Sequence, residues 1–237
     1  MISLRQIAKM IDHSILHPTF TDDDLLKNCE TALNYDVATV CVKPFHVAQA
    51  ARAVSGTGVG VCAVIGFPHG NGTTRIKKQE AEQVIQDGAT EVDMVVNIGK
   101  VLQHDWEYVS GELSLLNEAC TQNGAILKVI FETDFVTQDS DKIRLCEICN
   151  RHRVAFVKTS TGYGFVKGEN GLYSYKGATE HDIRLMRKHC SPEVQVKAAG
   201  GVRDLDRLLM VRDWGATRVG ATATAGIMEE ARARFTE

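Results

Sequence analysis

Three lysines and one aspartate stand among apolar residues in short β-branched segments of the chain. Asp93 lies in EVDMVVN, Lys128 in ILKVIF, Lys158 in VAFVKTS and Lys197 in VQVKA. In a parallel barrel, alternate residues of a strand point inward, so these four side chains would face the interior. A lone lysine in such a place would more simply be a solvated or ion-paired residue at a strand end. Four charged groups in one volume instead indicate an active site, because burying each unpaired charge is costly.

The chemistry that this cluster suits is imine formation between a lysine amine and an aldehyde or ketone. The attacking amine must be neutral, although a free lysine has a pKa of about 10.4. If Lys197 lies beside Lys158 in a partly desolvated pocket, repulsion between like charges should lower the pKa of Lys158. Lowering that pKa by about three would need about 4 kcal/mol of differential interaction. Asp93 would pair with Lys197 and handle protons, which makes these three residues the predicted catalytic group.

Placing these residues together requires strands that alternate with helices. Eight short apolar segments, each followed by a longer amphipathic one, span residues 11–16, 38–43, 60–65, 91–96, 126–131, 154–158, 194–198 and 217–221. This pattern is typical of repeated βα units around a parallel sheet. Eight units favour a single α/β domain over residues 1–237, folded as a closed (β/α)8 TIM barrel rather than an open doubly wound sheet.

Small residues follow the last two of these segments. Gly200 and Gly201 come after the seventh, and Gly220, Ala221 and Thr222 close the eighth. Barrels commonly bind phosphate at these positions through backbone N–H groups at a helix N-terminus. Paired glycines are more often simple tight turns. The phosphate interpretation therefore depends on their position beside the lysine cluster.

The segment 162–182 interrupts the alternation of apolar and amphipathic segments. It contains five glycines and three tyrosines between the sixth segment and the next helix. The composition predicts a long flexible loop, and long loops in compact domains are commonly functional lids or disordered excursions. Its place directly after a candidate catalytic strand favours an active-site lid.

The composition excludes several classes of function. With 44% hydrophobic and 24% charged residues the chain has ample material for a core, and a net charge of −3 without basic runs argues against nucleic acid as a partner. No segment has the length of a membrane span or the pattern of a signal peptide, so we expect a cytoplasmic enzyme with no membrane partner. The seven cysteines, an odd number, predict reduced thiols. Neither zinc-spaced ligands nor a dinucleotide fingerprint occurs.

Over nearly its whole length the chain resembles the deoxyribose-phosphate aldolase family. The motifs that carry the resemblance are IDHSILHPT, TVCVKP, VIGFPHGNGTT, EVDMVVNIG, LKVIFET, FVKTSTGY, VKAAGG and GATRVGA. The order and spacing of FVKTSTG and VKAAGG are the most specific of these. The resemblance implies a (β/α)8 barrel that reversibly cleaves 2-deoxy-D-ribose 5-phosphate to acetaldehyde and D-glyceraldehyde 3-phosphate without metal or cofactor. A homodimer is expected from the family alone.

The resemblance also implies roles for individual residues. Lys158 would be the Schiff-base nucleophile, Lys197 the cation that lowers its pKa, and Asp93 the partner in a proton relay through a bound water. The residues that match the family's substrate pocket and phosphate cradle are Asp12, Cys41, Lys128, Thr161, Gly162, Gly200, Gly201, Gly220, Ala221 and Thr222.

Three departures from the family pattern bear on the substrate. Lys43 stands where a neutral residue is common and would add positive charge near the barrel mouth. Thr222 and Ala223 replace a serine pair, so at most one hydroxyl remains for phosphate. The chain does not end on the tyrosine that some relatives use in proton transfer, and Tyr163, Tyr173 or Tyr175 would have to replace it.

Other functions are compatible with the same residues. One is a Schiff-base aldolase of a different substrate, with another acceptor aldehyde or an unphosphorylated sugar. Another is a phosphate-binding barrel isomerase in which Lys158 acts only as a charge, and a third is an inactive barrel that binds a sugar phosphate. Neither the isomerase nor the binder would form a covalent adduct with substrate.

Overall fold

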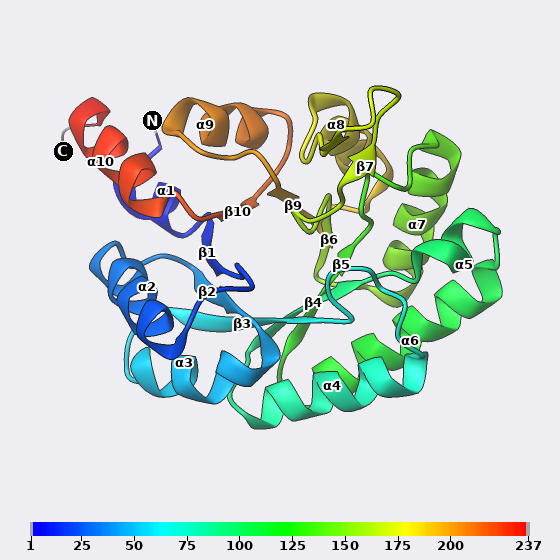
Figure 1. Cartoon of the computed structure of the whole chain (residues 1–237), viewed down its shortest axis with the longest axis horizontal. Coiled ribbons are helices and arrows are strands. Elements are labelled where there is room, and N and C mark those ends of the chain that lie inside the picture. Colours follow the sequence, from blue (N-terminus) through cyan, green and yellow to red (C-terminus); the bar gives the residue numbers. More distant parts are fainter. Residues whose placement is uncertain (1, 236–237) are drawn as a thin grey trace.

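The structure, a computed structural model, describes residues 2–235. Within that range the eight predicted segments form eight parallel strands that close into a barrel in the order β1-β10-β9-β6-β5-β4-β3-β2 (Figure 1). The strands are β1 (Ile11–Ile15), β2 (Thr39–Val42), β3 (Gly60–Ile65), β4 (Glu91–Val95), β5 (Ile126–Ile130), β6 (Phe156–Lys158), β9 (Gln195–Ala199) and β10 (Arg218–Ala221). The predicted TIM barrel is confirmed.

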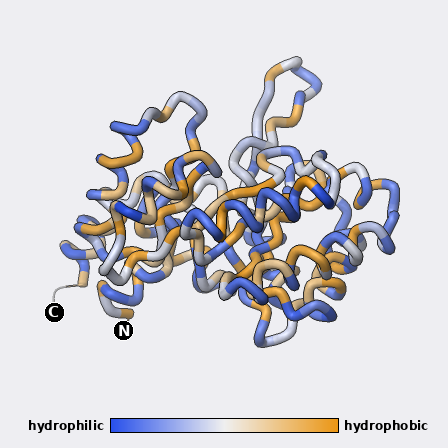
Figure 2. Tube along the Cα trace, turned by 90° about the horizontal axis from the view of Figure 1, so that it is seen from below, coloured by the Kyte–Doolittle hydropathy of each residue, from blue (hydrophilic) through white to orange (hydrophobic). Residues whose placement is uncertain are grey.

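Helices surround this barrel, and the first helix, α1, lies beside the last, α10 (Figure 1). The helices are α1 (Leu4–Ala8), α2 (Asp22–Asn34), η1 (Pro44–His46, a 3-10 turn), α3 (Val47–Ala53), α4 (Thr74–Gln86), α5 (Ile98–Leu102), α6 (Trp106–Gln122), α7 (Asp139–His152), α8 (Glu180–His189), α9 (Leu205–Asp213) and α10 (Thr224–Arg234). Apolar and polar positions alternate along the helical turns (Figure 2). Each helix can therefore bury one side against the strands.

Local sequence sets the helix ends. The Thr21 side chain accepts a hydrogen bond from the backbone N–H of Asp24, whose carboxylate accepts one from Thr21 in return, which starts α2. Helix α4 ends before Gly88, whose φ of 112° suits glycine best.

Strand register decides which side chains meet inside the barrel. Asp93 on β4 is level with Lys128 on β5, and Lys158 on β6 is level with Lys197 on β9. Their sequence neighbours, such as Val92 on β4, lie fully buried in the main hydrophobic core. Alternation along each strand therefore separates a charged interior from an apolar exterior, as predicted.

The segment 162–182, predicted to be a long flexible loop, contains regular secondary structure. It contains an antiparallel hairpin of β7 (Val166–Lys167) and β8 (Tyr173–Ser174), and its last residues already belong to α8. The turn closes through a 2.8 Å hydrogen bond from the Gly168 N–H to the Leu172 carbonyl, with Gly171 at a φ of 77°. A glycine in this conformation is typical of short hairpin loops. The number of glycines in the segment did not by itself indicate a hairpin.

The cysteines agree with the predicted reduced thiols. Within residues 2–235, all seven cysteines are buried and none forms a disulfide. The Cys146 and Cys149 pair lies on the buried side of α7 and serves packing. Among residues 2–235, no helix is long and apolar enough to cross a membrane.

Candidate active site

The predicted catalytic side chains meet inside the barrel around one carboxylate. Lys158 Nζ and Lys197 Nζ each donate to Asp93 Oδ2 at 2.7 Å. Lys128 Nζ donates to the other oxygen, Asp93 Oδ1, at 2.8 Å. The Asp93, Lys128 and Lys197 side chains are fully buried, and 3% of the Lys158 side chain is exposed. Of the three lysines, Lys158 is therefore the one with a surface that a substrate can reach.

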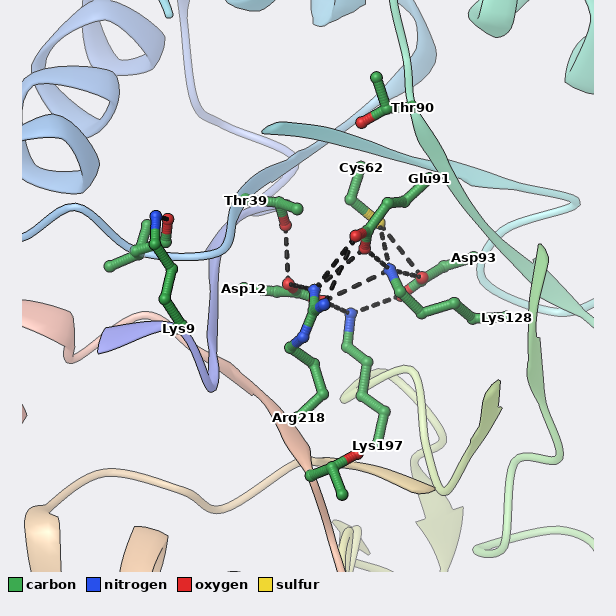
Figure 3. Close-up of polar contacts among 12 residues, drawn as sticks. Lys9, Asp12, Thr39, Cys62, Thr90, Glu91, Asp93, Lys128, Lys197 and Arg218 are labelled. Carbon is green, nitrogen blue, oxygen red and sulfur yellow. Dashed lines mark hydrogen bonds and ion pairs between the residues drawn. The ribbon is translucent and has the colours of Figure 1, made fainter. Parts of the chain in front are cut away.

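A second group of charges lies beside this one (Figure 3). Asp12 accepts hydrogen bonds from Lys197, from Thr39 Oγ1 at 2.8 Å and from Arg218 Nη1 at 2.6 Å. Arg218 also pairs with Glu91 at 3.0 Å, and Lys128 Nζ lies 2.6 Å from the same Glu91 carboxylate. The buried charges therefore form one continuous network, which we call the charged layer: Asp12, Glu91, Asp93, Lys128, Lys158, Lys197 and Arg218.

The charged layer shifts the pKa values of its members in opposite directions. Burial opposes ionisation of Asp93, yet the surrounding ammonium groups hold the pKa of this carboxyl well below its usual value. Burial likewise opposes charge on Lys128 and Lys197, but Asp12 and Asp93 raise the pKa of both lysines. Lys128 and Lys197 are therefore cations at neutral pH.

Two sets of side chains lie close enough together to chelate a cation: Cys41, Cys62 and Asp93, and Asp12, Cys62 and Glu91. In the second set, Lys128 Nζ lies 3.1 Å from Cys62 Sγ, 2.6 Å from Glu91 and 3.4 Å from Asp12. The lysine ammonium therefore fills the position that a cation would take. These residues fit an internal ion pair better than a metal centre.

A cavity of about 570 Å³ opens above Lys158. Its wall includes most of the predicted substrate-binding residues, namely Thr161, Gly162, Gly200, Gly201, Gly220, Ala221 and Thr222. Asp12, Cys41 and Lys128 lie buried beneath the cavity and do not line it. The structure thus divides the predicted set between the cavity wall and the layer under it.

Backbone conformation shapes the predicted phosphate side of this cavity. Gly200 and Gly201 have φ values of 87° and 84°, where residues with a Cβ are strained. A Cβ on Gly200 would come within 2.8 Å of Gly177 Cα, so two loops approach each other closely here. Thr222 precedes Ala223, the N-cap residue of α10, and the N-terminal N–H groups of this helix favour an anion.

Glu132 is a buried residue that sequence reasoning missed, and it bonds to Thr161 of this wall. It has a φ of 57°, and its carboxylate accepts hydrogen bonds from the Thr161 N–H at 3.3 Å and from the Thr161 hydroxyl. Burial raises the pKa of the Glu132 carboxyl. Glu132 therefore fixes the loop after β6 next to Lys158.

The three candidate tyrosines occupy different places. Tyr163 and Tyr175 line the cavity, whereas Tyr173 lies on the hairpin with 65% of its surface exposed. Lys43 does not line the cavity, since its Nζ donates to the His17 and Phe20 carbonyls at 3.0 Å. Its charge instead holds the loop between β1 and α2.

Glu91, Arg218 and Cys62 of the charged interior were also missed. Glu91 stands two residues before Asp93 on β4, so the alternation that identified Asp93 also places Glu91 inside the barrel. Arg218 and Cys62 likewise contact the charged interior. The alternation was visible in the sequence, but the sequence did not show the strand register, which decides which inward residues are level.

Comparison with known proteins fits this geometry. Residues 6–228 match the model of the family described as DeoC/LacD family aldolase. The chain belongs to this family. A Rhodopirellula baltica protein named deoxyribose-phosphate aldolase is 51% identical over 95% of this chain and 89% of its own length. A Clostridium perfringens protein of the same name is 43% identical over 95% of both chains.

Among solved structures, the chain resembles a deoxyribose phosphate aldolase from Aeropyrum pernix that is described as tetrameric. The TM-score is 0.86 with 26% identity, over 98% of this chain and 94% of that one. Family membership makes the chain an aldolase, and therefore a lyase that acts on a small-molecule substrate. The DeoC aldolases are of class I, which use a lysine Schiff base.

Proposed function

We propose that this chain reversibly cleaves 2-deoxy-D-ribose 5-phosphate to acetaldehyde and D-glyceraldehyde 3-phosphate through an imine on Lys158. The observation that carries the proposal is the position of Lys158. Its amine is the lysine nitrogen that lies both at the cavity floor and within 2.7 Å of Asp93. The resemblance to proteins named deoxyribose-phosphate aldolase supports the choice of substrate.

Three carboxylates of the layer, Asp12, Glu91 and Asp93, have cationic partners other than Lys158, namely Lys128, Lys197 and Arg218. None of these carboxylates therefore depends on Lys158 as its only ion-pair partner, and the Lys158 amine is left for the substrate. The neutral amine is the form that attacks an aldehyde.

The proposed reaction begins with attack of Lys158 Nζ on C1 of the open-chain sugar. Loss of water gives the imine, and a base then takes the proton of the C3 hydroxyl as the C2–C3 bond breaks. D-glyceraldehyde 3-phosphate leaves, and the electron pair remains on the lysine-bound two-carbon enamine. Protonation of the enamine at C2 and hydrolysis release acetaldehyde and regenerate Lys158. The protonated imine accepts the electron pair, so the proposed route calls for no metal or other cofactor.

Asp93 and Lys197 are the proposed proton-handling groups. Asp93 Oδ2 lies within hydrogen-bonding distance of both amines, so a proton can pass between Lys158 and Lys197 through one carboxylate. Although burial opposes charge on Lys197, Asp12 and Asp93 raise its pKa, so Lys197 rests as a cation that can donate a proton toward Lys158.

Phosphate is proposed to bind at the other end of the cavity. Gly200, Gly201 and Thr222 bring backbone N–H groups and one hydroxyl to the wall, and Arg203 lines the same wall. An anion is favoured where a guanidinium and a helix N-terminus meet. Comparing the turnover of 2-deoxyribose with that of its 5-phosphate tests this assignment. Equal turnover would favour an aldolase of unphosphorylated aldoses.

We further propose that the chain acts in the cytoplasm as a homodimer, without nucleic acid or membrane partners. The net charge of −3 supports the absence of a nucleic-acid partner. The described relative from Aeropyrum pernix is tetrameric, so a larger assembly is the competing state. Light scattering at several protein concentrations distinguishes monomer, dimer and tetramer.

Reductive trapping tests the imine itself. The protein is incubated with acetaldehyde and sodium borohydride, and intact mass and peptide mapping locate the adduct. A two-carbon adduct on Lys158 that is lost in Lys158→Ala is expected, and Lys197→Ala should trap much more slowly. The exposed Lys188, in the last turn of α8, provides a matched control, because Lys188→Ala should trap like the parent. No adduct on the folded protein would refute the aldolase mechanism and favour a non-covalent isomerase or binder.

A further inference from the structure

Two thiols face each other inside the barrel beneath the active-site cavity. Cys41 on β2 is level with Cys62 on β3, and both side chains point inward. Cys41 Sγ, Cys62 Sγ and an Asp93 carboxylate oxygen all lie within 4.8 Å of one another. The proposed reaction uses neither sulfur. The two thiols are therefore nucleophiles beside the active site for which the proposed reaction has no role.

The two thiols differ in character. Cys62 Sγ donates to Asp93 Oδ1 at 3.1 Å and accepts from Lys128 Nζ at the same distance (Figure 3). Burial raises the pKa of the Cys62 thiol, whereas contact with Cys62 and the nearby Lys197 lowers the pKa of Cys41. A thiol with a lowered pKa is the better nucleophile toward oxidants. Cys41 is thus placed to react first and Cys62 to follow.

The thiol pair lies behind two side chains of the cavity wall. Cys41, Cys62 and Leu16 belong to one small apolar cluster, against which Tyr163 packs. Leu16 and Tyr163 also line the cavity. A peroxide that enters the cavity is therefore separated from the buried sulfurs by these side chains, and it reaches them when the side chains move aside.

The strand geometry allows a bond between these sulfurs. Neighbouring strands lie about 4.8 Å apart, and disulfides span Cα separations of about 4.4–6.8 Å. A bond between level residues of adjacent strands needs little backbone movement.

We propose that Cys41 and Cys62 form a reversible disulfide when a peroxide enters the cavity, and that this bond switches the enzyme off. The Cys41 thiolate attacks the peroxide oxygen, giving a sulfenic acid and, for hydrogen peroxide, hydroxide that is protonated to water. Cys62 then attacks the sulfenic sulfur, and the expelled hydroxide takes the Cys62 proton as a second water. Two thiols are oxidised while one peroxide is reduced to two waters. A dithiol reverses the change.

The disulfide would disturb the site through Asp93. Cys62 loses the hydrogen that it donates to Asp93 Oδ1, and its sulfur turns toward Cys41 and away from Lys128 Nζ. Asp93 is the carboxylate that joins Lys158 to Lys197. The effect on turnover rests on the proposed aldolase function, whereas disulfide formation does not.

The test exposes the protein to a small excess of hydrogen peroxide and measures turnover, free thiols and disulfide-linked peptides in parallel. We expect turnover to fall at least tenfold as the Cys41–Cys62 peptide forms, and to return with dithiothreitol. Cys41→Ser and Cys62→Ser, each compared with its own untreated activity, should lose the reversible part of the response. Occupying the cavity with substrate should slow the oxidation.

A second thiol contact supplies the matched control. Cys146 interacts with Cys190 in the main hydrophobic core, a different cluster from that of Cys41 and Cys62, and this contact raises the pKa of Cys146. Cys190→Ser should therefore leave the peroxide response unchanged. Cys41 and Cys62 recovered as free thiols after inactivation would overturn the proposal, as would a Cys41–Cys62 disulfide with full turnover. A failure of the aldolase assignment would instead leave the peptide map intact and remove turnover from the untreated protein.

Discussion

Replacing Arg218 with Met removes one cation from the charged layer while keeping an apolar side chain of similar length. The Arg218 side chain is 15% exposed, and it pairs with the fully buried Asp12 at 2.6 Å and with Glu91 at 3.0 Å. Removing one partner of a buried ion pair costs about 3–5 kcal/mol. Asp12 keeps Lys197 and Lys128 as partners, so we expect the lower end, a loss of about 3 kcal/mol in the free energy of unfolding.

The loss should depend on pH in a defined direction. Burial disfavours the ionised form of Asp12, yet Lys128, Lys197 and Arg218 together hold the pKa of its carboxyl below the usual value. A lowered pKa stabilises the folded state above the unfolded pKa of about 3.9, and this stabilisation disappears as the pH falls. The difference between Arg218→Met and the parent should therefore be largest near pH 7 and narrow below about pH 4.

Urea unfolding at pH 7 and at several acidic pH values measures these differences, with turnover recorded in parallel. Turnover should fall about tenfold to a hundredfold, because Asp12 also positions Lys197. Arg218→Lys keeps the charge without the planar fork and should lose less stability. An unfolding free energy of Arg218→Met within about 0.5 kcal/mol of the parent at pH 7 would refute the reasoning.

Two further predictions concern a close backbone approach at the cavity wall and a buried ion pair between α4 and α6. Gly200→Ala should reduce turnover and stability more than Gly201→Ala, because both glycines have a positive φ but only the Gly200 Cβ would meet a neighbour, Gly177 Cα at 2.8 Å. Equal losses in kcat/KM and in urea midpoint would contradict this close approach. Lys77→Met should destabilise the protein by about 3–5 kcal/mol, since Lys77 pairs with the buried Glu112 at 2.9 Å. The double variant Lys77→Met, Glu112→Leu should recover most of that loss in the same unfolding assay, and a loss equal to the sum of the single variants would show that the pair is not coupled.

The amino-acid sequence by itself determined the fold and the chemistry of the site. Eight β-branched segments separated by amphipathic ones specify a parallel barrel, because each strand must bury one face against helices. The alternation of Asp93 with Val92 and Met94 assigns the charged side chain to the interior. These signals are local, since each depends on residues within one strand or helix.

The tertiary structure decided which charges pair and which amine meets the cavity. Closure of the barrel brings β1 beside β10, so that Asp12 meets Arg218 although 206 positions separate them. Register across β6 and β9 places Lys158 level with Lys197. The two side chains differ only slightly in exposure, with 3% of the Lys158 side chain exposed and 0% of the Lys197 side chain. No periodicity within a segment carries this information. The pairing of charges depends on the stagger and closure of strands from opposite ends of the chain, because hydrogen bonds between strands fix it.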